Sequence, residues 1–218
     1  MSAKPFDLIV FDMDGTLVDS MGCLADWLHR AVKVHCPPSV TPVTITKAFG
    51  PKEEKIIEQF VPVDLVKECL NAYYDLYERE HDRVYVYQGI NELLRQVQAQ
   101  GIPMALCTGK SRRAVEISLD ILNWETLFKT IITGDDTVRF KPDPEGLNLI
   151  LGNAKASRGR TIFIGDAAAD TGAARNAGII SGCAQWGAPE LMPTENAHPD
   201  YLFATPQAVV DILSGASL

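Results

Sequence analysis

The fold of this chain is decided by residues 8–17, which read Leu8-Ile9-Val10-Phe11-Asp12-Met13-Asp14-Gly15-Thr16-Leu17. Four consecutive apolar residues predict a buried strand of a parallel sheet, because such strands are covered on both faces. Two carboxylates follow at the carboxyl end of this strand, just before a glycine allows the chain to turn. Ligands of open α/β sheets bind at that end of the strands. We therefore expect an α/β fold whose chemistry begins at Asp12 and Asp14.

Asp12 and Asp14 are two residues apart, so on an extended strand they share a face at about 6–7 Å. One carboxylate can attack a phosphoryl group and form an aspartyl phosphate. The other can protonate the leaving oxygen and later activate water. A simple turn explains the Asp-Gly pair equally well, because both residues favour turns.

The composition is that of a folded, acidic protein. Of its 218 residues, 46% are hydrophobic and 22% are charged, and the formal net charge is −8. Nonspecific attraction to nucleic acid or to an anionic membrane is therefore not expected. No stretch has the length and apolarity of a membrane span, and the N-terminus lacks a signal-peptide apolar region. We expect a cytoplasmic protein without nucleic-acid or membrane partners, whose five scattered cysteines form neither disulfides nor a zinc site.

The chain changes character twice. Residues 21 to about 83 show apolar residues at helical spacing, as at Leu24, Trp27 and Leu28, and contain no convincing strand. Elsewhere helices and strands alternate, which predicts a Rossmann-like parallel sheet with helices on both faces. We expect strands at 8–11, 103–107, 130–133, 161–164, 179–180 and 201–203, and helices near 90–100, 111–122, 143–152, 168–177 and 206–214. Right-handed crossovers then bring every strand-to-helix loop to one edge of the sheet.

The strand at 103–107 leads into a second motif, Thr108-Gly109-Lys110-Ser111. A hydroxyl beside free backbone N–H groups at a helix start is suited to holding phosphate oxygens. Capping of the helix by Thr108 or Ser111 is the alternative interpretation. Lys110, with Arg112 and Arg113, is interpreted as solvated.

A third motif places Lys141 before Pro142-Asp143-Pro144. Asp143 as a helix cap and Pro144 in the first turn explain those two residues without chemistry. Lys141 is left unexplained by a helix start. A fixed ammonium there can neutralise charge on a transferring phosphoryl group, whereas an ordinary surface lysine is the alternative.

The fourth motif is Gly165-Asp166-Ala167-Ala168-Ala169-Asp170, after the strand at 161–164. With Asp166 as the cap, Asp170 lies on the same side of the following helix. Acids at a helix N-terminus are stabilising in any case, which is the structural alternative. Asp166 together with Asp12 would form a hard oxygen site for Mg²⁺, which prefers few carboxylates and a substrate phosphate.

In this order the four motifs closely resemble those of the haloacid dehalogenase superfamily, in the branch of phosphoglycolate phosphatases and β-phosphoglucomutase. The motifs are Asp12-x-Asp14-Gly15-Thr16, Thr108-Gly109, Lys141-Pro142 and Gly165-Asp166-x-x-x-Asp170. The resemblance covers nearly the whole chain. It implies that residues 1–17 and 86–218 form the core domain and that residues 18–85 form the family's helical cap domain.

The resemblance also implies a role for each matching residue. Asp12 would be the nucleophile and Asp14 the general acid and base. Thr108, Gly109 and Lys141 would bind the phosphoryl group. Mg²⁺ would be held by Asp12, the backbone carbonyl of Asp14 and Asp166, and Asp170 would order the metal waters or Lys141. Ala167 stands where many relatives have Ser or Thr, so we expect a hydrogen bond to be missing there.

The cap is expected to select the substrate, because its closure would exclude water and contact the leaving group. Relatives use a loop at the place of Gly50-Pro51-Lys52, so Gly50 and Lys52 are candidate substrate contacts. A helix break with a solvated lysine is the alternative. Arg79 and Arg83 are weaker candidates and fit an exposed helix face.

The function that these residues favour is hydrolysis of a small phosphorylated metabolite, of the phosphoglycolate, sugar phosphate or nucleotide class, by a Mg²⁺-dependent phosphatase. A sugar-phosphate mutase uses the same residues but returns the phosphoryl group to its substrate. A noncatalytic binding or regulatory module on the same fold is a third hypothesis, which the intact set of acids and Lys141 disfavours. Dehalogenation is disfavoured because dehalogenases of the superfamily lack the acid that Asp14 supplies.

Overall fold

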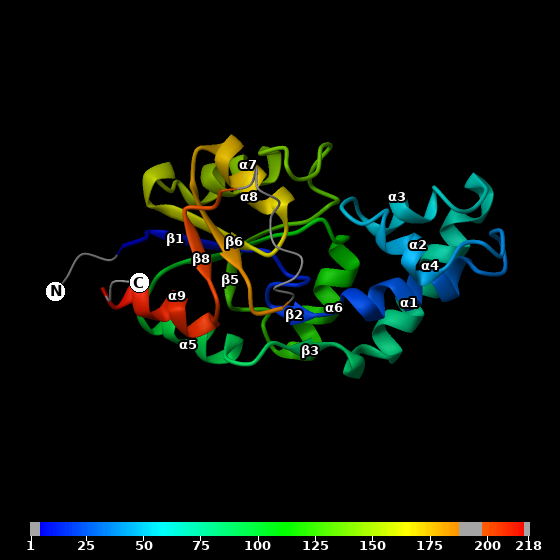
Figure 1. Ribbon diagram of the computed structural model, residues 1–218, viewed down its shortest axis with the longest axis horizontal. Coiled ribbons are helices and arrows are strands. Elements are labelled where there is room, and N and C mark those ends of the chain that lie inside the picture. Colours follow the sequence, from blue (N-terminus) through cyan, green and yellow to red (C-terminus); the bar gives the residue numbers. More distant parts are fainter. Residues whose placement is uncertain (1–4, 188–197, 216–218) are drawn as a thin grey trace.

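A computed structural model describes residues 5–187 and 198–215 (Figure 1). Residues 1–4, 188–197 and 216–218 of the predicted core domain lie outside this part. The main sheet has six parallel strands in the order β5-β4-β1-β6-β7-β8. Their bounds are Leu8–Phe11 for β1, Met104–Cys107 for β4, Phe128–Ile132 for β5, Thr161–Gly165 for β6, Ile180–Ala184 for β7 and Tyr201–Phe203 for β8. The quoted strand β1 is therefore central, between β4 and β6.

Helices cover both faces of this sheet (Figure 1). One face carries α5 (Ile90–Ala99), α6 (Arg112–Leu122) and α9 (Pro206–Leu213), and the other carries α7 (Glu145–Ala154) and α8 (Ala168–Ala177). Alternate residues of β1 serve the two layers, since Ile9 and Phe11 belong to one hydrophobic cluster and Leu8 and Val10 to the other. This division explains why the strand is apolar at every position.

The stretch between β1 and α5 forms a helical unit to one side of the sheet (Figure 1). It contains α1 (Met21–Val32), α2 (Pro42–Thr46), α3 (Glu53–Ile57) and α4 (Val66–Arg79), with short 3₁₀ turns at Val63–Leu65 and His81–Arg83. Its two connections to the core pair as an antiparallel ribbon of β2 (Val18–Asp19) and β3 (Tyr85–Val86). This ribbon was not predicted. The ribbon contains residues 18 and 85, which we predicted as the ends of the cap domain.

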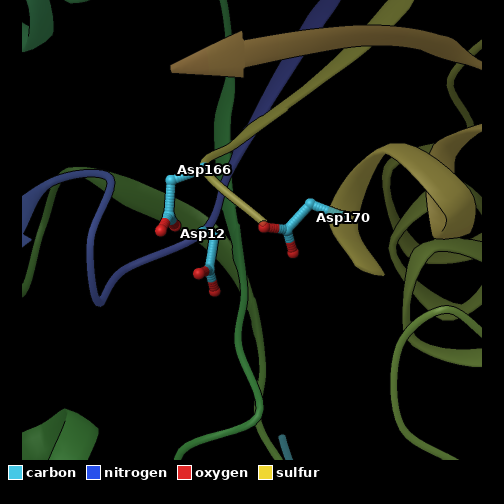
Figure 2. A group of neighbouring side chains, drawn as sticks. All are labelled: Asp12, Asp166 and Asp170. Carbon is cyan, nitrogen blue, oxygen red and sulfur yellow. The ribbon is translucent and has the colours of Figure 1, made fainter. Parts of the chain in front are cut away.

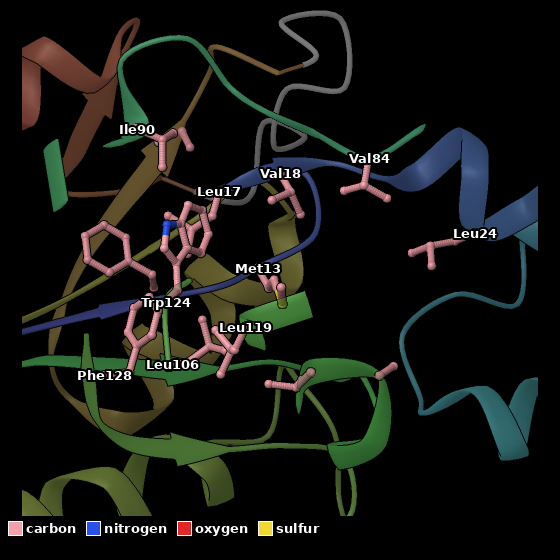
Figure 3. Packing of buried hydrophobic residues seen from close by; sticks show 14 of the residues in the cluster. Met13, Leu17, Val18, Leu24, Val84, Ile90, Leu106, Leu119, Trp124 and Phe128 are labelled. Carbon is pink, nitrogen blue, oxygen red and sulfur yellow. The ribbon is translucent and has the colours of Figure 1, made fainter. Parts of the chain in front are cut away.

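The larger hydrophobic cluster continues from the core to the helical unit (Figure 3). Met13, Leu17 and Val18 follow β1, and the same cluster includes Leu24 of α1 and Val84 beside the ribbon. Burial of a large apolar side chain stabilises a fold by about 1.5–3 kcal/mol. This shared interior therefore holds the helical unit against the edge of the sheet where the four motifs lie.

Several details differ from the predictions, and β7 continues to Ala184, four residues beyond its expected end. Strand β5 begins at Phe128, two residues before the expected start, and α7 begins only at Glu145 because Asp143 Oδ1 accepts a hydrogen bond from the Glu145 N–H at 3.0 Å. Asp166 is not the cap of α8, since Ala167 occupies that position. As predicted, the five cysteines are free thiols. No helix within the described residues is long and apolar enough to cross a membrane.

Candidate active site

Three carboxylates meet at the carboxyl edge of the sheet (Figure 2). Asp12 follows β1 and Asp166 follows the adjacent strand β6, so the pairing of these strands places the two residues side by side. Asp170 is in the first turn of α8, three residues after its cap. One carboxylate oxygen of each residue lies within 4.8 Å of the other two. With Lys141, which contacts two of them, these residues are called the inner cluster below.

Gly15 allows this close approach. Its φ of +83° favours glycine, and a Cβ atom there would lie only 2.4 Å from Asp166 Oδ2. The next residue holds Asp166 in place, since Thr16 Oγ1 donates a hydrogen bond to Asp166 Oδ1 at 3.0 Å. The turn interpretation of Asp14-Gly15 is therefore confirmed, and this turn packs the first motif against the fourth.

Lys141 is half-buried and belongs to the inner cluster. Its Nζ lies 2.9 Å from Asp12 Oδ1 and 2.5 Å from Asp170 Oδ1, and it lies over the Phe163 ring. Although burial by itself lowers the pKa of Lys141, the two carboxylates raise it above its ordinary value, so the lysine carries its proton. The interpretation of Lys141 as an ordinary surface lysine is wrong.

The inner cluster has more negative than positive charge. Burial, reinforced by Asp170 and Asp166, raises the pKa of Asp12 to about 8, although Lys141 opposes the shift. Burial and Asp170 raise the pKa of Asp166 to about 6. The single ammonium of Lys141 does not balance the charge of the three carboxyl groups around it. A divalent ion that prefers oxygen ligands therefore fits the inner cluster.

A second group of side chains, called the cap-facing cluster below, consists of Asp14, Lys110, Glu53 and Tyr73. Asp14 Oδ1 accepts a hydrogen bond from Ser20 Oγ at 2.5 Å, and its Oδ2 lies 3.2 Å from Lys110 Nζ. Lys110 is 5% exposed and its ammonium lies over the Tyr77 ring. The interpretation of Lys110 as solvated is wrong, because the helical unit covers it.

Glu53 and Tyr73 come from the helical unit and were not found by sequence reasoning. Glu53 Oε1 lies 3.9 Å from Lys110 Nζ and accepts a hydrogen bond from the Tyr73 hydroxyl at 3.2 Å. Glu53 Oε2 accepts a hydrogen bond from the backbone N–H of Ser111 at 2.9 Å, at the start of α6. A glutamate in the first turn of a short helix is ordinarily a stabilising surface residue, so its sequence position carried no signal of burial.

The second motif lies where β4 meets the helical unit. Thr108 is buried, and its N–H donates to the carbonyl of Ile132 in the neighbouring strand. Gly109 has no room for a side chain, because a Cβ atom there would lie 2.4 Å from the carbonyl oxygen of Gly50. The Gly50 loop therefore rests directly on the phosphate-binding motif expected from the sequence.

Lys52 lies beside this loop but is directed to the core surface. Its Nζ is 2.6 Å from Asp135 Oδ1 and 3.0 Å from Glu54 Oε2. Lys52 is not among the described residues that line the cavity, whereas Gly50 is. The arrangement thus brings Gly50 to the site and uses Lys52 to join the helical unit to the core. Arg79 and Arg83 are on the exposed helix face, as expected.

A cavity of about 240 Å³ lies between the two clusters. Its polar lining includes Asp12, Asp14, Lys110, Lys141 and Glu53, together with Thr108, Asp166 and Asp170. Leu24, Leu28, Phe49, Ile56 and Met21 of the helical unit form an apolar wall. The lining thus contains five carboxyl groups and two ammonium groups, and the helical unit covers this cavity.

Known proteins share this chain's sequence pattern. The model of the family described as haloacid dehalogenase-like hydrolase matches residues 9–183. A phosphoglycolate phosphatase of Pseudomonas putida is 31% identical over 181 residues, which cover 79% of this chain and 66% of that relative. A pyrophosphatase PpaX of Bacillus velezensis is 28% identical over 206 residues, which cover 93% of this chain and 94% of that protein.

A solved structure shares the fold. A protein of Haemophilus somnus, described as a predicted phosphoglycolate phosphatase, superposes with a TM-score of 0.81 at 24% identity, covering 98% of this chain and 99% of the other. The α/β fold class and the family resemblance predicted from the sequence are both confirmed. The chain spans about two thirds of the length of the Pseudomonas putida relative.

Proposed function

The chain belongs to the haloacid dehalogenase-like hydrolase family, and from this premise we propose that it is a Mg²⁺-dependent phosphatase that hydrolyses a small phosphomonoester through an aspartyl phosphate on Asp12. One observation carries the proposal: Asp12 and Asp14 line a single cavity with Lys141, which is far from them in the sequence. The names of the relatives, phosphoglycolate phosphatase and pyrophosphatase, support the predicted enzyme class.

In the first step a carboxylate oxygen of Asp12 attacks the phosphorus atom. The bond from phosphorus to the ester oxygen breaks, and Asp14 gives its proton to that oxygen so that a neutral alcohol leaves. Asp14 is suited to this role because it faces the helical unit, where the leaving group has to lie. Ser20 and Lys110 fix its two oxygens.

In the second step water attacks the phosphorus atom of the aspartyl phosphate. Asp14, now ionised, accepts a proton from this water, and the bond between phosphorus and the Asp12 oxygen breaks. Inorganic phosphate is released, Asp12 is regenerated as a carboxylate and Asp14 is again protonated. The same residue thus serves as acid and then as base.

Lys141 and Thr108 bind the nonbridging phosphoryl oxygens in this proposal. The ammonium of Lys141 is fixed by Asp12 and Asp170, so little reorganisation is needed as charge moves during transfer. Asp170 acts as a positioning residue, since its Oδ2 also accepts a hydrogen bond from the Ala167 N–H at 2.9 Å.

The inner cluster fits Mg²⁺, since its carboxylate oxygens lie within 4.8 Å of one another and carry uncompensated negative charge. We assign the ligands to Asp12, the backbone carbonyl of Asp14 and Asp166. When bound, the ion would offset the repulsion between the Asp12 carboxylate and a phosphate dianion.

Residues 18–85 act as the cap domain in this proposal. The Gly50 carbonyl over Gly109, the Lys52–Asp135 ion pair and the Glu53–Ser111 hydrogen bond all join this unit to the core. Closure of this kind excludes water from the first step, whereas the second step and product release need it to loosen.

The proposal is tested by measuring phosphate release from p-nitrophenyl phosphate with and without Mg²⁺. We expect turnover that EDTA removes and that excess Mg²⁺ restores, and we expect Asp12→Asn to be inactive. Asp19→Asn is the matched control, because Asp19 is an exposed aspartate seven residues further along the chain, in β2. Full activity of the Asp12→Asn enzyme would refute the assigned nucleophile.

A further inference from the structure

Among the described residues that line the cavity, each cation has carboxylates as ion-pair partners, although Lys110 Nζ makes no hydrogen bond. Among the described residues that line it, the basic side chains are Lys141 and Lys110. Lys141 belongs to the phosphoryl site, between Asp12 and Asp170. Lys110 is the cation nearest to the cap, and it already lies between Asp14 and Glu53 at 3.2 and 3.9 Å.

The charge on the cap side is unfavourable to an anion in both protonation states of Asp14. When Asp14 is ionised, two carboxylates face one ammonium. When Asp14 holds the proton for the leaving oxygen, Glu53 and Lys110 neutralise each other and no cation is left over. A carboxylate or second phosphate on the leaving group would thus meet the Glu53 carboxylate, and Glu53 is only 5% exposed, so that solvent screens its charge weakly.

The hydrogen-bonding capacity of Glu53 has a different consequence. Tyr73 and Ser111 donate one hydrogen bond each to its two oxygens, and a carboxylate has about four acceptor positions. Glu53 can therefore accept a further hydrogen bond from a hydroxyl group in the cavity. Leu24, Leu28 and Ile56 line the rest of the cap side and offer only apolar contact.

We propose that the natural substrate is a phosphomonoester of a small, uncharged alcohol with a second hydroxyl near the ester, and that Glu53 selects it by excluding leaving groups that carry a carboxylate or a second phosphate. This rests on the proposed phosphatase function. It separates the chain from the substrates that its relatives' names imply, because the leaving groups there, glycolate and the phosphate released from pyrophosphate, are both anions. The cavity of about 240 Å³ has room for a small phosphomonoester.

A matched pair of substrates tests the proposal without any mutation. 2-Hydroxyethyl phosphate and 2-phosphoglycolate differ only in a hydroxymethyl group in place of a carboxylate. We expect kcat/KM of the wild-type protein with Mg²⁺ to be at least about tenfold higher for 2-hydroxyethyl phosphate. Equal or faster hydrolysis of 2-phosphoglycolate would overturn the proposal.

The Glu53→Gln variant tests whether Glu53 causes the preference between the two esters. A glutamine oxygen can still accept the Ser111 hydrogen bond, but the charge is gone, so we expect the preference to fall to about threefold or less. Glu54→Gln is the matched control, since Glu54 is the adjacent residue of α3 and does not line the cavity. Its preference should equal that of the wild type. An unchanged preference in Glu53→Gln would show that Glu53 does not select.

Binding separates this proposal from the proposed function. If the wild-type protein released no phosphate from either ester or from p-nitrophenyl phosphate, the phosphatase function would fail. Calorimetric titration of the Asp12→Asn protein with both esters would then measure the selectivity of binding independently of turnover. Tighter binding of 2-hydroxyethyl phosphate supports the proposal, and tighter or equal binding of 2-phosphoglycolate overturns it.

Discussion

The inner cluster and the cap-facing cluster each surround one lysine with carboxylates, yet they are assembled in different ways. Lys141, Asp12 and Asp166 all follow the strands or loops of the core, and the pairing of β1 with β6 brings the two aspartates together. The cap-facing cluster needs the helical unit, because Glu53 and Tyr73 reach Lys110 only when α3 and α4 pack on the core. The difference suggests that the core supplies the chemistry and the cap supplies the choice of substrate.

Removal of the proposed nucleophile is the strongest test of this difference between the core and the cap. We expect Asp12→Asn to lower kcat by at least about 10⁴-fold, as loss of a nucleophile does in other hydrolases. The loss should be similar for every phosphate ester, because the inner cluster handles the shared phosphoryl group. Steady-state kinetics with p-nitrophenyl phosphate and 2-hydroxyethyl phosphate would check this, and a loss confined to one ester would place Asp12 outside the chemistry.

Asp14 lies at the boundary between the clusters, so its effect should depend on the leaving group. We expect Asp14→Asn to lower kcat for an alkyl phosphate by about 10²–10⁴-fold, the usual contribution of a general acid and base. The first step with p-nitrophenyl phosphate should suffer less, because nitrophenolate leaves without a proton. Burst kinetics of nitrophenolate release would measure that step. Equal losses in the first step for both esters would contradict the role as an acid.

Lys110 tests whether the cap-facing cluster stabilises the closed structure. Lys110→Met removes the ammonium and leaves Asp14 and Glu53 facing each other, so we expect the free energy of unfolding to fall by about 3–5 kcal/mol. Urea denaturation measures this change. Lys129→Met is the control, since Lys129 is exposed on β5 and its replacement should change stability by less than about 0.5 kcal/mol. Equal stability of the two variants would contradict the proposed contribution of the cluster.

The inner cluster should make stability depend on metal and pH. Burial raises the pKa of Asp12 to about 8 and that of Asp166 to about 6, above the value of about 3.9 in an unfolded chain. Between these values the folded state binds more protons than the unfolded state, so metal-free stability falls as pH rises from 4 to 8. Mg²⁺ should therefore raise the melting temperature more at pH 8 than at pH 5. A pH-independent effect of Mg²⁺ in thermal denaturation would contradict the assigned ligands.

The smallest effect is expected at the outer contact between the two regions. The Lys52–Asp135 ion pair is partly exposed, and such pairs contribute about 0.2–1 kcal/mol. A double-mutant cycle of Lys52→Ala and Asp135→Ala should give a coupling energy in this range. Lys55→Ala is the control, because Lys55 pairs with Glu58 within the helical unit and should show no coupling to Asp135. A coupling energy above 2 kcal/mol would contradict this expectation and would make the Lys52–Asp135 ion pair a major contact between the cap and the core.

Many features of the fold followed from local patterns. The apolar run of β1, the alternation after Gly89 and the helical spacing of residues 21–83 predicted the sheet and the inserted helices. The errors lie at element ends, where Asp143 and Asp170 make side-chain hydrogen bonds that periodicity does not reveal. The β2–β3 ribbon was missed because two short segments far apart in the chain form it, and neither is a strand alone.

The sequence by itself determined the inner cluster, because parallel strands joined by right-handed crossovers must present their following loops at one edge, whatever lies between them. Only the tertiary structure decided the cap-facing cluster. Lys110 and Glu53 look like surface residues in their own segments, and they become a buried pair because the apolar interior shared by core and cap presses the helical unit onto the sheet. Burial of a residue depends on the packing of the whole molecule. In our proposal this burial allows the Glu53 charge to select the substrate.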